Sequence, residues 1–177
     1  MKIIIASDIH GSASSAKNIL SKANKNDKII LLGDIYNHGP RNPLPDGWAP
    51  MEVAAALNSH KKNLTVLQGN CDSEVDQMIS EFRFKKKLTL NLDRLLFFSH
   101  GHKFNIDNPP SKLAKGAVVF YGHFHIPYIK EQDGVYFVNP GSCALPLGGN
   151  PKSYATYENG KITIFDLDDN VIIEKQL

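Results

Sequence analysis

The stretch KIIIASDIHG, residues 2–11, joins a continuous apolar run directly to two polar side chains, Asp8 and His10. A short run of β-branched apolar residues is typical of a strand that is buried on both faces, as in the parallel sheets of α/β proteins. In such sheets, ligands gather beyond the carboxyl ends of the strands. The stretch therefore predicts an α/β fold in which the first strand, 2–6, delivers Asp8 and His10 to a functional site.

The residues that follow continue this pattern. Residues 12–24 begin with serines that favour a helix start and carry apolar residues on one helical face. A second buried strand at 28–32 completes a β-α-β unit, for which a right-handed parallel pair is expected. A second helix is expected at 51–62, and further strands at 64–67, 94–99, 117–122 and 135–139.

The rest of the chain is expected to add turns, loops and an antiparallel part. Residues 153–177 alternate in polarity and turn at ENGK and LDDN, which favours an antiparallel meander. The basic stretch RFKKK, 83–87, is interpreted as a solvated hairpin or loop edge. The long, proline-rich connection 33–50 is of a kind that is usually either functional or disordered. Because there is no internal repeat and no linker, we expect one domain, 1–177.

The composition argues against several function classes. Of 177 residues, 42% are hydrophobic and 21% charged, and the net charge of +2 does not favour a nucleic-acid or an anionic-membrane partner. The N-terminal apolar run is too short for a signal peptide, and no stretch approaches the length of a transmembrane helix. Cys71 and Cys143 form no disulfide framework and no CxxC motif. We therefore expect a cytoplasmic protein without a membrane partner.

Several of the expected strands end in polar residues of one kind. The junction sequences are SDIHG, GD, QGN, HGH and GHFH, and they supply Asp8, His10, Asp34, Asn70, His100, His102, His123 and His125. One such junction alone is more often a polar loop start or a turn. Their joint occurrence, each at a strand end, is not explained by turns. Together they predict a metal site.

The residue types narrow the choice of metal. Carboxylate, imidazole and amide oxygen without thiolate suit divalent ions such as Mn²⁺, Fe²⁺ or Zn²⁺ better than a structural zinc site. So many candidate ligands exceed the needs of one tetrahedral ion. They fit two ions that share a bridging carboxylate about 3.5–4 Å apart, an arrangement that clamps an in-line phosphoryl displacement.

The series DIH, GD, GNCD, HGH and GHFH resembles the calcineurin-like metallophosphoesterase superfamily, and most of all its small bacterial YfcE-type phosphodiesterase branch. The resemblance covers nearly the whole chain and includes GPRNPLP (39–45), GNCDSEVDQM (69–78), NPGS (139–142) and GGNP (148–151). It implies a four-layer α-β-β-α sandwich of two mixed sheets, the metallophosphoesterase fold.

The resemblance also implies a ligand set. Position by position, Asp8, His10 and His125 would hold a first metal; Asn70, His100 and His123 would hold a second; and Asp34 would bridge the two. Mn²⁺ is the first choice, with Fe²⁺, Zn²⁺ and Ni²⁺ as alternatives.

One position departs from the wider superfamily. Many members carry a histidine after the Gly-Asn pair, where it is thought to protonate the leaving group, whereas this chain and the YfcE-type branch carry Cys71. Asp72 keeps the carboxylate that orients this acid in the histidine-bearing relatives. Three interpretations of Cys71 stay open: a small buried hydrophobe, a side chain that lines the site, or a covalent nucleophile. The expected catalytic residues are Asn70, Cys71, Asp72 and His100.

Three further side chains are candidates for substrate binding. His38 and Arg41 lie in the long connection, and His102 follows the expected ligand His100. For His38 an exposed loop histidine is the more ordinary role. For Arg41 a structural salt bridge is as ordinary as a contact with phosphate. Cys143 is interpreted as a packing residue.

The function expected from this pattern is hydrolysis of a small-molecule phosphodiester by a bridging hydroxide at a two-metal site. Alternatives are a phosphomonoesterase, or a catalytically idle metal-binding scaffold of the same fold, such as a retromer subunit. A nuclease is less favoured because 177 residues leave little room for added DNA-binding elements. Apolar surface around Trp48 and in the C-terminal strands could support a homo-oligomer.

Overall fold

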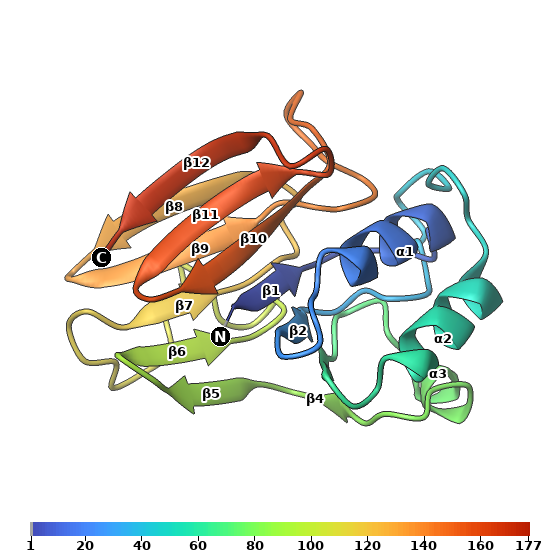
Figure 1. Cartoon of the computed structure of the whole chain (residues 1–177), viewed down its shortest axis with the longest axis horizontal. Helices are drawn as coiled ribbons and strands as arrows, with labels where there is room; N and C mark the ends of the chain where they lie inside the picture. The colour runs from blue at the N-terminus through green and yellow to red at the C-terminus, as the bar shows by residue number, and fades with distance from the viewer. Residues whose placement is uncertain (1) are drawn as a thin grey trace.

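The computed structural model describes residues 2–177, which form two β-sheets packed against each other (Figure 1). The helices are α1 (Ala13–Ser21), α2 (Pro50–Ser59) and α3 (Glu74–Met78). The strands are β1 (Ile3–Ala6), β2 (Lys28–Leu31), β3 (Leu64–Leu67), β4 (Phe84–Lys85), β5 (Leu88–Asn91), β6 (Leu95–Phe98), β7 (Val118–Phe120), β8 (Pro127–Gln132), β9 (Val135–Pro140), β10 (Ser153–Glu158), β11 (Lys161–Asp166) and β12 (Val171–Gln176).

The first sheet has seven strands in the order β12-β11-β10-β1-β2-β3-β4. Strands β1 to β4 run parallel, with Ile3 opposite Lys28 across the β1–β2 pair. Strands β10, β11 and β12 form the expected antiparallel meander, and β10 joins it to β1. The predicted parallel β-α-β start and C-terminal meander are thus both confirmed, and the completely buried β1 lies at the centre of the sheet.

The second sheet has five strands in the order β5-β6-β7-β9-β8. Its inner strands β6, β7 and β9 are parallel, and the edge strands β5 and β8 are antiparallel to their neighbours. Both sheets therefore mix parallel and antiparallel pairs, as the fold class predicted.

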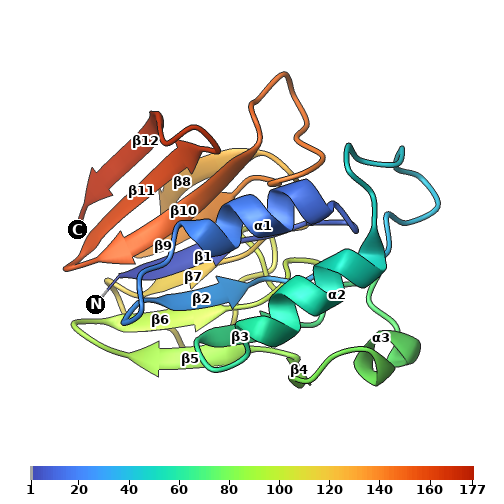
Figure 2. The same ribbon diagram turned by 45° about the vertical axis from the view of Figure 1, so that its right-hand side comes forward.

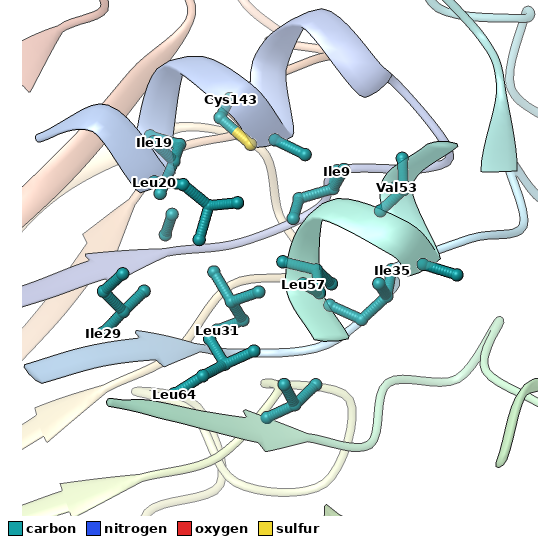
Figure 3. Packing of buried hydrophobic residues seen from close by; sticks show 14 of the residues in the cluster. Ile9, Ile19, Leu20, Ile29, Leu31, Ile35, Val53, Leu57, Leu64 and Cys143 are labelled. Atoms are coloured by element: carbon teal, nitrogen blue, oxygen red, sulfur yellow. The ribbon is translucent and has the colours of Figure 1, made fainter. Parts of the chain in front are cut away.

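Three groups of buried side chains hold the layers together. One lies between the two sheets and contains Ile3, Phe98 and Phe120, whose two phenyl rings stack with their centroids 5.1 Å apart. A second lies under α1 and α2, which cross the outer face of the first sheet over β1 to β3 (Figure 2). Figure 3 shows this second group, in which Cys143 packs near Ile19 and Leu20. Cys143 is completely buried, which confirms its interpretation as a packing residue.

The layer outside the second sheet differs from the expectation of helices. Phe97 and Tyr121 on this face are covered by Phe104, Ile106 and Leu113. These three residues belong to the segment 101–116, which forms turns and bends without a regular helix. The irregular segment buries the same apolar face that a helix would bury.

Several predicted boundaries need correction. Helix α1 starts after its N-cap Ser12, which accepts a hydrogen bond from the amide of Ser15, but it ends at Ser21 rather than at residue 24. Helix α2 starts with Pro50 at its first turn and ends at Ser59. The basic stretch 83–87 is not a hairpin, because β4 pairs with β3 in the first sheet while β5 belongs to the second. Its three lysines are exposed, as expected for a solvated edge.

Among residues 2–177, the three helices are all too short or too polar to span a lipid bilayer.

Candidate metal centre

The two sheets bring the polar ends of five strands to one place. The ends of β1, β2 and β3 come from the first sheet, and those of β6 and β7 come from the second. Five of the side chains involved have backbone φ angles between 49° and 67°, namely Asp8, His10, Asp34, His123 and His125. Residues other than glycine pay roughly 1–2 kcal/mol for this left-handed conformation. Such strain concentrates at functional sites, where the surrounding structure holds it in place.

Asp8, His10 and His125 form the first group of candidate ligands. The Nε2 atom of His125 lies 3.2 Å from Asp8 Oδ1, and the Nε2 atom of His10 lies 3.7 Å from the same oxygen. All three side chains are buried. Their ligand atoms lie within 4.8 Å of one another, close enough to meet at one ion.

Asp34 links this group to a second one. Its Oδ2 atom lies 3.8 Å from His10 Nε2 and 3.4 Å from His100 Nε2. His100 Nε2 in turn lies 2.9 Å from the amide oxygen of Asn70. The other Asp34 oxygen accepts a hydrogen bond from the amide of Cys71 at 2.8 Å. One carboxylate oxygen thus faces both groups, which is the position expected for a bridge.

His123 lies at the edge of the second group. Its ring centroid is 5.2 Å from that of His100, and its backbone N–H donates to Asp8 Oδ2 at 3.0 Å. The structure therefore gathers all seven expected metal ligands, with His123 set slightly apart from the tightest clusters.

Backbone carbonyls fix the orientation of three of these histidines. The Nδ1 atom of His10 lies 2.8 Å from the carbonyl oxygen of Asn37, that of His100 lies 3.0 Å from Leu32 O, and that of His125 lies 2.6 Å from Leu145 O. A carbonyl oxygen only accepts hydrogen bonds, so each Nδ1 carries the proton. In the neutral form of each ring, which is the form that binds metal, the Nε2 lone pair then points into the centre.

This arrangement leaves nitrogen and oxygen lone pairs in the centre that receive no hydrogen bond from the described residues. The Nε2 atoms of His10 and His125 face each other at 3.3 Å, although both are acceptors in the neutral tautomers just described. Asp8 Oδ1 is buried and has no hydrogen-bond partner among residues 2–177. Buried polar atoms are rarely left unpaired. Carboxylate and imidazole donors aimed at one space fit a divalent cation, so the residues present suit the metals that the sequence implies.

The ionisable groups influence one another strongly. Burial alone would raise the pKa of the Asp34 carboxyl, but hydrogen bonding and attraction to His100 lower it. Burial likewise opposes a charge on His100, yet Asp34 and Asp8 raise its pKa to about 9. In the absence of metal, the carboxylates therefore draw positive charge to the centre.

Asp72 supports the centre through hydrogen bonds to the backbone next to it. Its carboxylate accepts three backbone hydrogen bonds, from Asp34 N at 2.8 Å, Ile35 N at 2.7 Å and Gly69 N at 2.7 Å. Burial raises its pKa to about 6, and repulsion from the Asp34 charge adds to the rise. Asp72 thus ties the end of β2 to the end of β3 and positions Asp34.

Cys71 is only half-buried, unlike Cys143. Its Sγ atom lies 3.4 Å from the amide nitrogen of Asn70 and against the backbone of Gly39. Burial, followed by the charge of Asp34, raises the pKa of the thiol to about 12. Of the three interpretations, the half-exposed position favours a side chain that lines the site over a packed core residue.

A hollow of about 680 Å³ opens over the centre. It is lined by Asp34, Asn37, Gly39, Pro40, Arg41, Asn42, Asn70, Cys71, His123, His125 and Leu147. Arg41 therefore lies beside the candidate centre, whereas His38 is not among the lining residues. The ring of His38 instead meets Trp48 edge to face, with the centroids 6.3 Å apart. His102 lines a separate, smaller hollow beside Asn70.

Another hollow, of about 700 Å³, lies over the outer face of β10 and β11. It is lined by Lys22, Tyr154 and Thr163, among others, and contains none of the clustered histidines. Its size alone does not make it a reaction site, because none of its described lining residues belongs to a group of candidate metal ligands.

Sequence reasoning missed residues that shape the centre without entering it. The amide of Asn139 donates to Gly122 O at 2.8 Å, and the hydroxyl of Ser142 donates to Asp8 O at 2.8 Å. The NPGS motif therefore holds two of the polar strand ends in place, a role that its sequence does not reveal. Gly69 and Gly122 are also required, since a Cβ atom would lie 2.0 Å from Asp34 Oδ1 and 1.8 Å from Ser7 Oγ, respectively.

Comparison with known proteins agrees with this geometry. The chain is 40% identical over 178 aligned positions to Phosphodiesterase YfcE of Escherichia coli strain K12, covering 98% of this chain and 96% of that protein. The solved structure of YfcE, described as a phosphoesterase from E. coli, matches with a TM-score of 0.93 at 38% identity and covers 99% of both chains.

A more distant likeness shows the fold alone. Vacuolar Protein Sorting 29 from Cryptosporidium parvum matches with a TM-score of 0.65 at 17% identity, covering 99% of this chain and 98% of that one. The family model described as the Calcineurin-like phosphoesterase superfamily domain matches residues 1–161. The chain belongs to the calcineurin-like phosphoesterase superfamily.

Proposed function

We propose that this protein is a metal-dependent phosphodiesterase with a two-metal centre. The observation that carries the proposal is the Asp34 oxygen that faces both His10 and His100. The activity named for the 40% identical YfcE supports a phosphodiester as the substrate. The hollow above the centre has room for a small molecule.

The proposed ligand sets follow the two groups of side chains. Asp8, His10 and His125 hold one ion, and Asn70, His100 and His123 hold the other, with Asp34 between them. When bound, two divalent ions supply Lewis acidity that polarises a phosphate and makes water a good nucleophile at neutral pH. Mn²⁺ is the proposed ion, with Fe²⁺, Zn²⁺ or Ni²⁺ as alternatives, because the donors are oxygen and imidazole nitrogen.

The protein's own side chains position the substrate and the ligands. The carbonyls of Asn37, Leu32 and Leu145 keep the three histidines in the binding tautomer. Arg41 lines the hollow and is placed to pair with a phosphate oxygen. Cys71 lines the wall of the hollow next to Asn70. Its proposed role is to contact the leaving group rather than to attack phosphorus. Asp72 acts through the backbone of Asp34.

The proposal also covers the compartment, the domain organisation and the oligomeric state of the enzyme. Two free thiols, Cys71 and Cys143, suit a reducing compartment such as the cytoplasm. Residues 1–177 act as one domain, since three apolar clusters join both sheets and the helices. The exposed side chains of Trp48 and Val171 are candidate contacts for a homo-oligomer.

The test compares matched substrates with defined metal loading. Metal-stripped protein is reloaded with Mn²⁺, Fe²⁺, Zn²⁺ or Ni²⁺ and assayed on bis(p-nitrophenyl) phosphate and on p-nitrophenyl phosphate. The expected result is metal-dependent release of p-nitrophenolate, faster from the diester and highest with Mn²⁺. Faster hydrolysis of the monoester would favour the phosphomonoesterase, and inactivity with every metal would favour the idle scaffold.

A further inference from the structure

Two hollows meet at Asn70. The larger one, of about 680 Å³, includes Asn70 and Cys71 on one side of the centre. The smaller one, of about 270 Å³, also includes Asn70 and is completed by Gln68, Gly69, Asp72, Lys86, His102 and Lys103. A phosphodiester has two ester arms. A phosphate held near Asn70 could therefore extend one arm into each hollow.

The smaller hollow carries positive charge that no side chain among residues 2–177 neutralises through an ion pair. Lys86 and Lys103 are exposed, and neither forms an ion pair with any of residues 2–177. Other surface lysines do form such pairs, for example Lys17 with Glu52 at 2.6 Å. The carboxylate in this hollow, Asp72, already accepts three backbone hydrogen bonds. The two ammonium groups are thus free to meet a ligand.

The two lysines reach this hollow from different parts of the fold. Lys86 lies in the short connection between β4 and β5, where the chain passes from the first sheet to the second. Lys103 comes three residues after His100, in the segment that follows β6. The larger hollow is different, since Pro40, Leu147 and Cys71 line it and its only cationic side chain outside the metal ligands is Arg41.

We propose that the smaller hollow selects an anionic arm of the substrate, with Lys86 and Lys103 as the specificity-determining residues. The substrate class is then an unsymmetrical phosphodiester in which one alcohol carries a further phosphate or carboxylate group. This inference rests on the proposed phosphodiesterase activity and adds the charge of the substrate to it. The His102 ring borders the same hollow and can hydrogen-bond to the same anionic group.

The test uses p-nitrophenyl phosphodiesters that share one leaving group and differ only in the second alcohol. The arms are 1,3-propanediol (neutral), 3-hydroxypropionate (carboxylate), 3-hydroxypropyl phosphate (phosphate) and choline (cationic). Bis(p-nitrophenyl) phosphate is the reference. With Mn²⁺-loaded protein, we expect kcat/KM to be highest for the two anionic arms and lowest for choline. The preference should weaken as salt is added, since exposed charges are screened within about 10 Å at 0.1 M.

Single variants identify the residues responsible. Lys86→Ala and Lys103→Ala should each lower kcat/KM for the anionic diesters by about fivefold, the size of an exposed charge interaction. They should leave bis(p-nitrophenyl) phosphate nearly unchanged. The matched controls are Lys85→Ala and Lys87→Ala, which remove the neighbouring exposed lysines that do not line the hollow. These controls should retain the preference for anionic arms.

The outcomes separate this inference from the proposed activity. Equal kcat/KM for the neutral and anionic diesters, or an equal loss on bis(p-nitrophenyl) phosphate in both lysine variants, would overturn the anionic-arm assignment while the phosphodiesterase stands. Failure to hydrolyse any diester with any metal would overturn the proposed function. In that case calorimetry measures how tightly the anionic and neutral diesters bind to the wild type and to the Lys86→Ala/Lys103→Ala double variant. Equal affinities of the wild type for anionic and neutral diesters would overturn the inference as well. A loss of affinity in the double variant that is confined to the anionic diesters would support it.

Discussion

The Oδ2 atom of Asp34 lies 3.4 Å from the Nε2 atom of His100, although the two residues follow strands of different sheets. Asp34 comes after β2 and His100 after β6. The candidate centre therefore spans the junction between the sheets. Its geometry depends on how the sheets pack, and the apolar cluster between them is what fixes it.

The Asp34→Asn variant should lose activity and bind metal weakly. Removing a shared carboxylate leaves the two ions with one more unit of uncompensated charge in a partly buried site. We expect a fall in turnover of at least about a hundredfold, as for loss of other strong electrostatic contacts in active sites. Activity is measured on bis(p-nitrophenyl) phosphate, and bound metal by elemental analysis.

The control for this variant is Asp133→Asn, an exposed turn residue with a φ angle of 54° that asparagine also tolerates. It should keep full activity and metal content. Near-normal turnover of Asp34→Asn with two ions still bound would contradict the bridging role.

Metal binding should raise the melting temperature of the stripped protein. Asp8 and Asp34 are both buried in the centre, and the charge of Asp8 opposes the charge of Asp34. A ligand that binds only the folded state stabilises it by about 4 kcal/mol when present at 1,000 times its Kd. Calorimetry with increasing Mn²⁺ checks this, and the Asp34→Asn variant should show a smaller shift. No change in melting temperature at saturating metal would argue against the site.

The long connection 33–50 offers two substitutions that should affect different properties, substrate binding and loop packing. Arg41 lines the hollow, so Arg41→Ala should raise KM with little change in melting temperature. His38 faces Trp48 instead, so His38→Ala should act on loop packing and leave KM nearly unchanged. Steady-state kinetics and thermal melts on both variants separate the roles. A larger kinetic effect for His38→Ala than for Arg41→Ala would reverse this assignment.

The same connection contains contacts that could not be predicted from the sequence. Its length predicted a functional role, but the choice between His38 and Arg41 depends on how its second half is anchored. The hydroxyl of Ser12 donates to Asp46 O at 2.7 Å, and the amide of Ala13 donates to Gly47 O at 2.9 Å. These contacts link the loop to the start of α1. No local sequence pattern predicts these contacts, because every residue has a backbone carbonyl that can accept a hydrogen bond.

The strands that the sequence did not predict are all at sheet edges. β4 ends the first sheet, and β5 and β8 are the two edges of the second. In β5 the side chains alternate between half-buried and exposed, and most of β8 is exposed after its first residues. Edge strands need no continuous apolar run. The inner strands, by contrast, were predictable because both of their faces are buried.

The candidate ligands were predictable for the same reason. Each follows an inner strand, where the apolar run ends at the sheet's carboxyl edge. The structure brings them together, while their roles as ligands remain predictions. What the sequence could not supply was the tautomer of His10, His100 and His125, since it is set by carbonyls from residues 27, 68 and 20 positions away.

A stability prediction concerns Tyr157, far from the centre. Its ring is buried between the sheets, and its hydroxyl donates to both carboxylate oxygens of Asp93 at 2.7 Å. Tyr157→Phe should therefore destabilise the protein by about 1.5 kcal/mol, the low end of the usual range for a hydrogen bond to a charged group, because Asp93 is partly exposed. Thermal and urea unfolding measure this. The control Tyr136→Phe, at a half-buried tyrosine whose hydroxyl has no hydrogen bond with residues 2–177, should be nearly neutral. Equal melting temperatures for both variants would show that the Asp93 contact contributes nothing.

The last prediction concerns Cys71, whose thiol faces the hollow next to Asn70. A thiol is a weak hydrogen-bond donor, so it gives little help to a leaving group that needs a proton. Aryl diesters have leaving groups that depart unaided and should be far better substrates than alkyl monoesters. Cys71→Ser keeps the size and polarity of the wall and should retain most diesterase activity. A histidine at this position can donate a proton near neutral pH, so Cys71→His should add monoesterase activity.

Space around residue 71 makes this last test specific. A Cβ atom on Gly39 would lie 2.9 Å from the sulfur, so the backbone of the loop closes one side of the position. An imidazole must therefore turn toward the hollow, where the leaving group is expected. The control Cys143→Ser changes the other cysteine, which is completely buried under α1, and should lower stability rather than alter substrate preference. A Cys71→Ser variant that loads metal normally yet is inactive on bis(p-nitrophenyl) phosphate would show that the thiol takes part directly in the reaction. Serine is similar in size and polarity to cysteine, so the main property lost in this variant is the reactivity of the thiol.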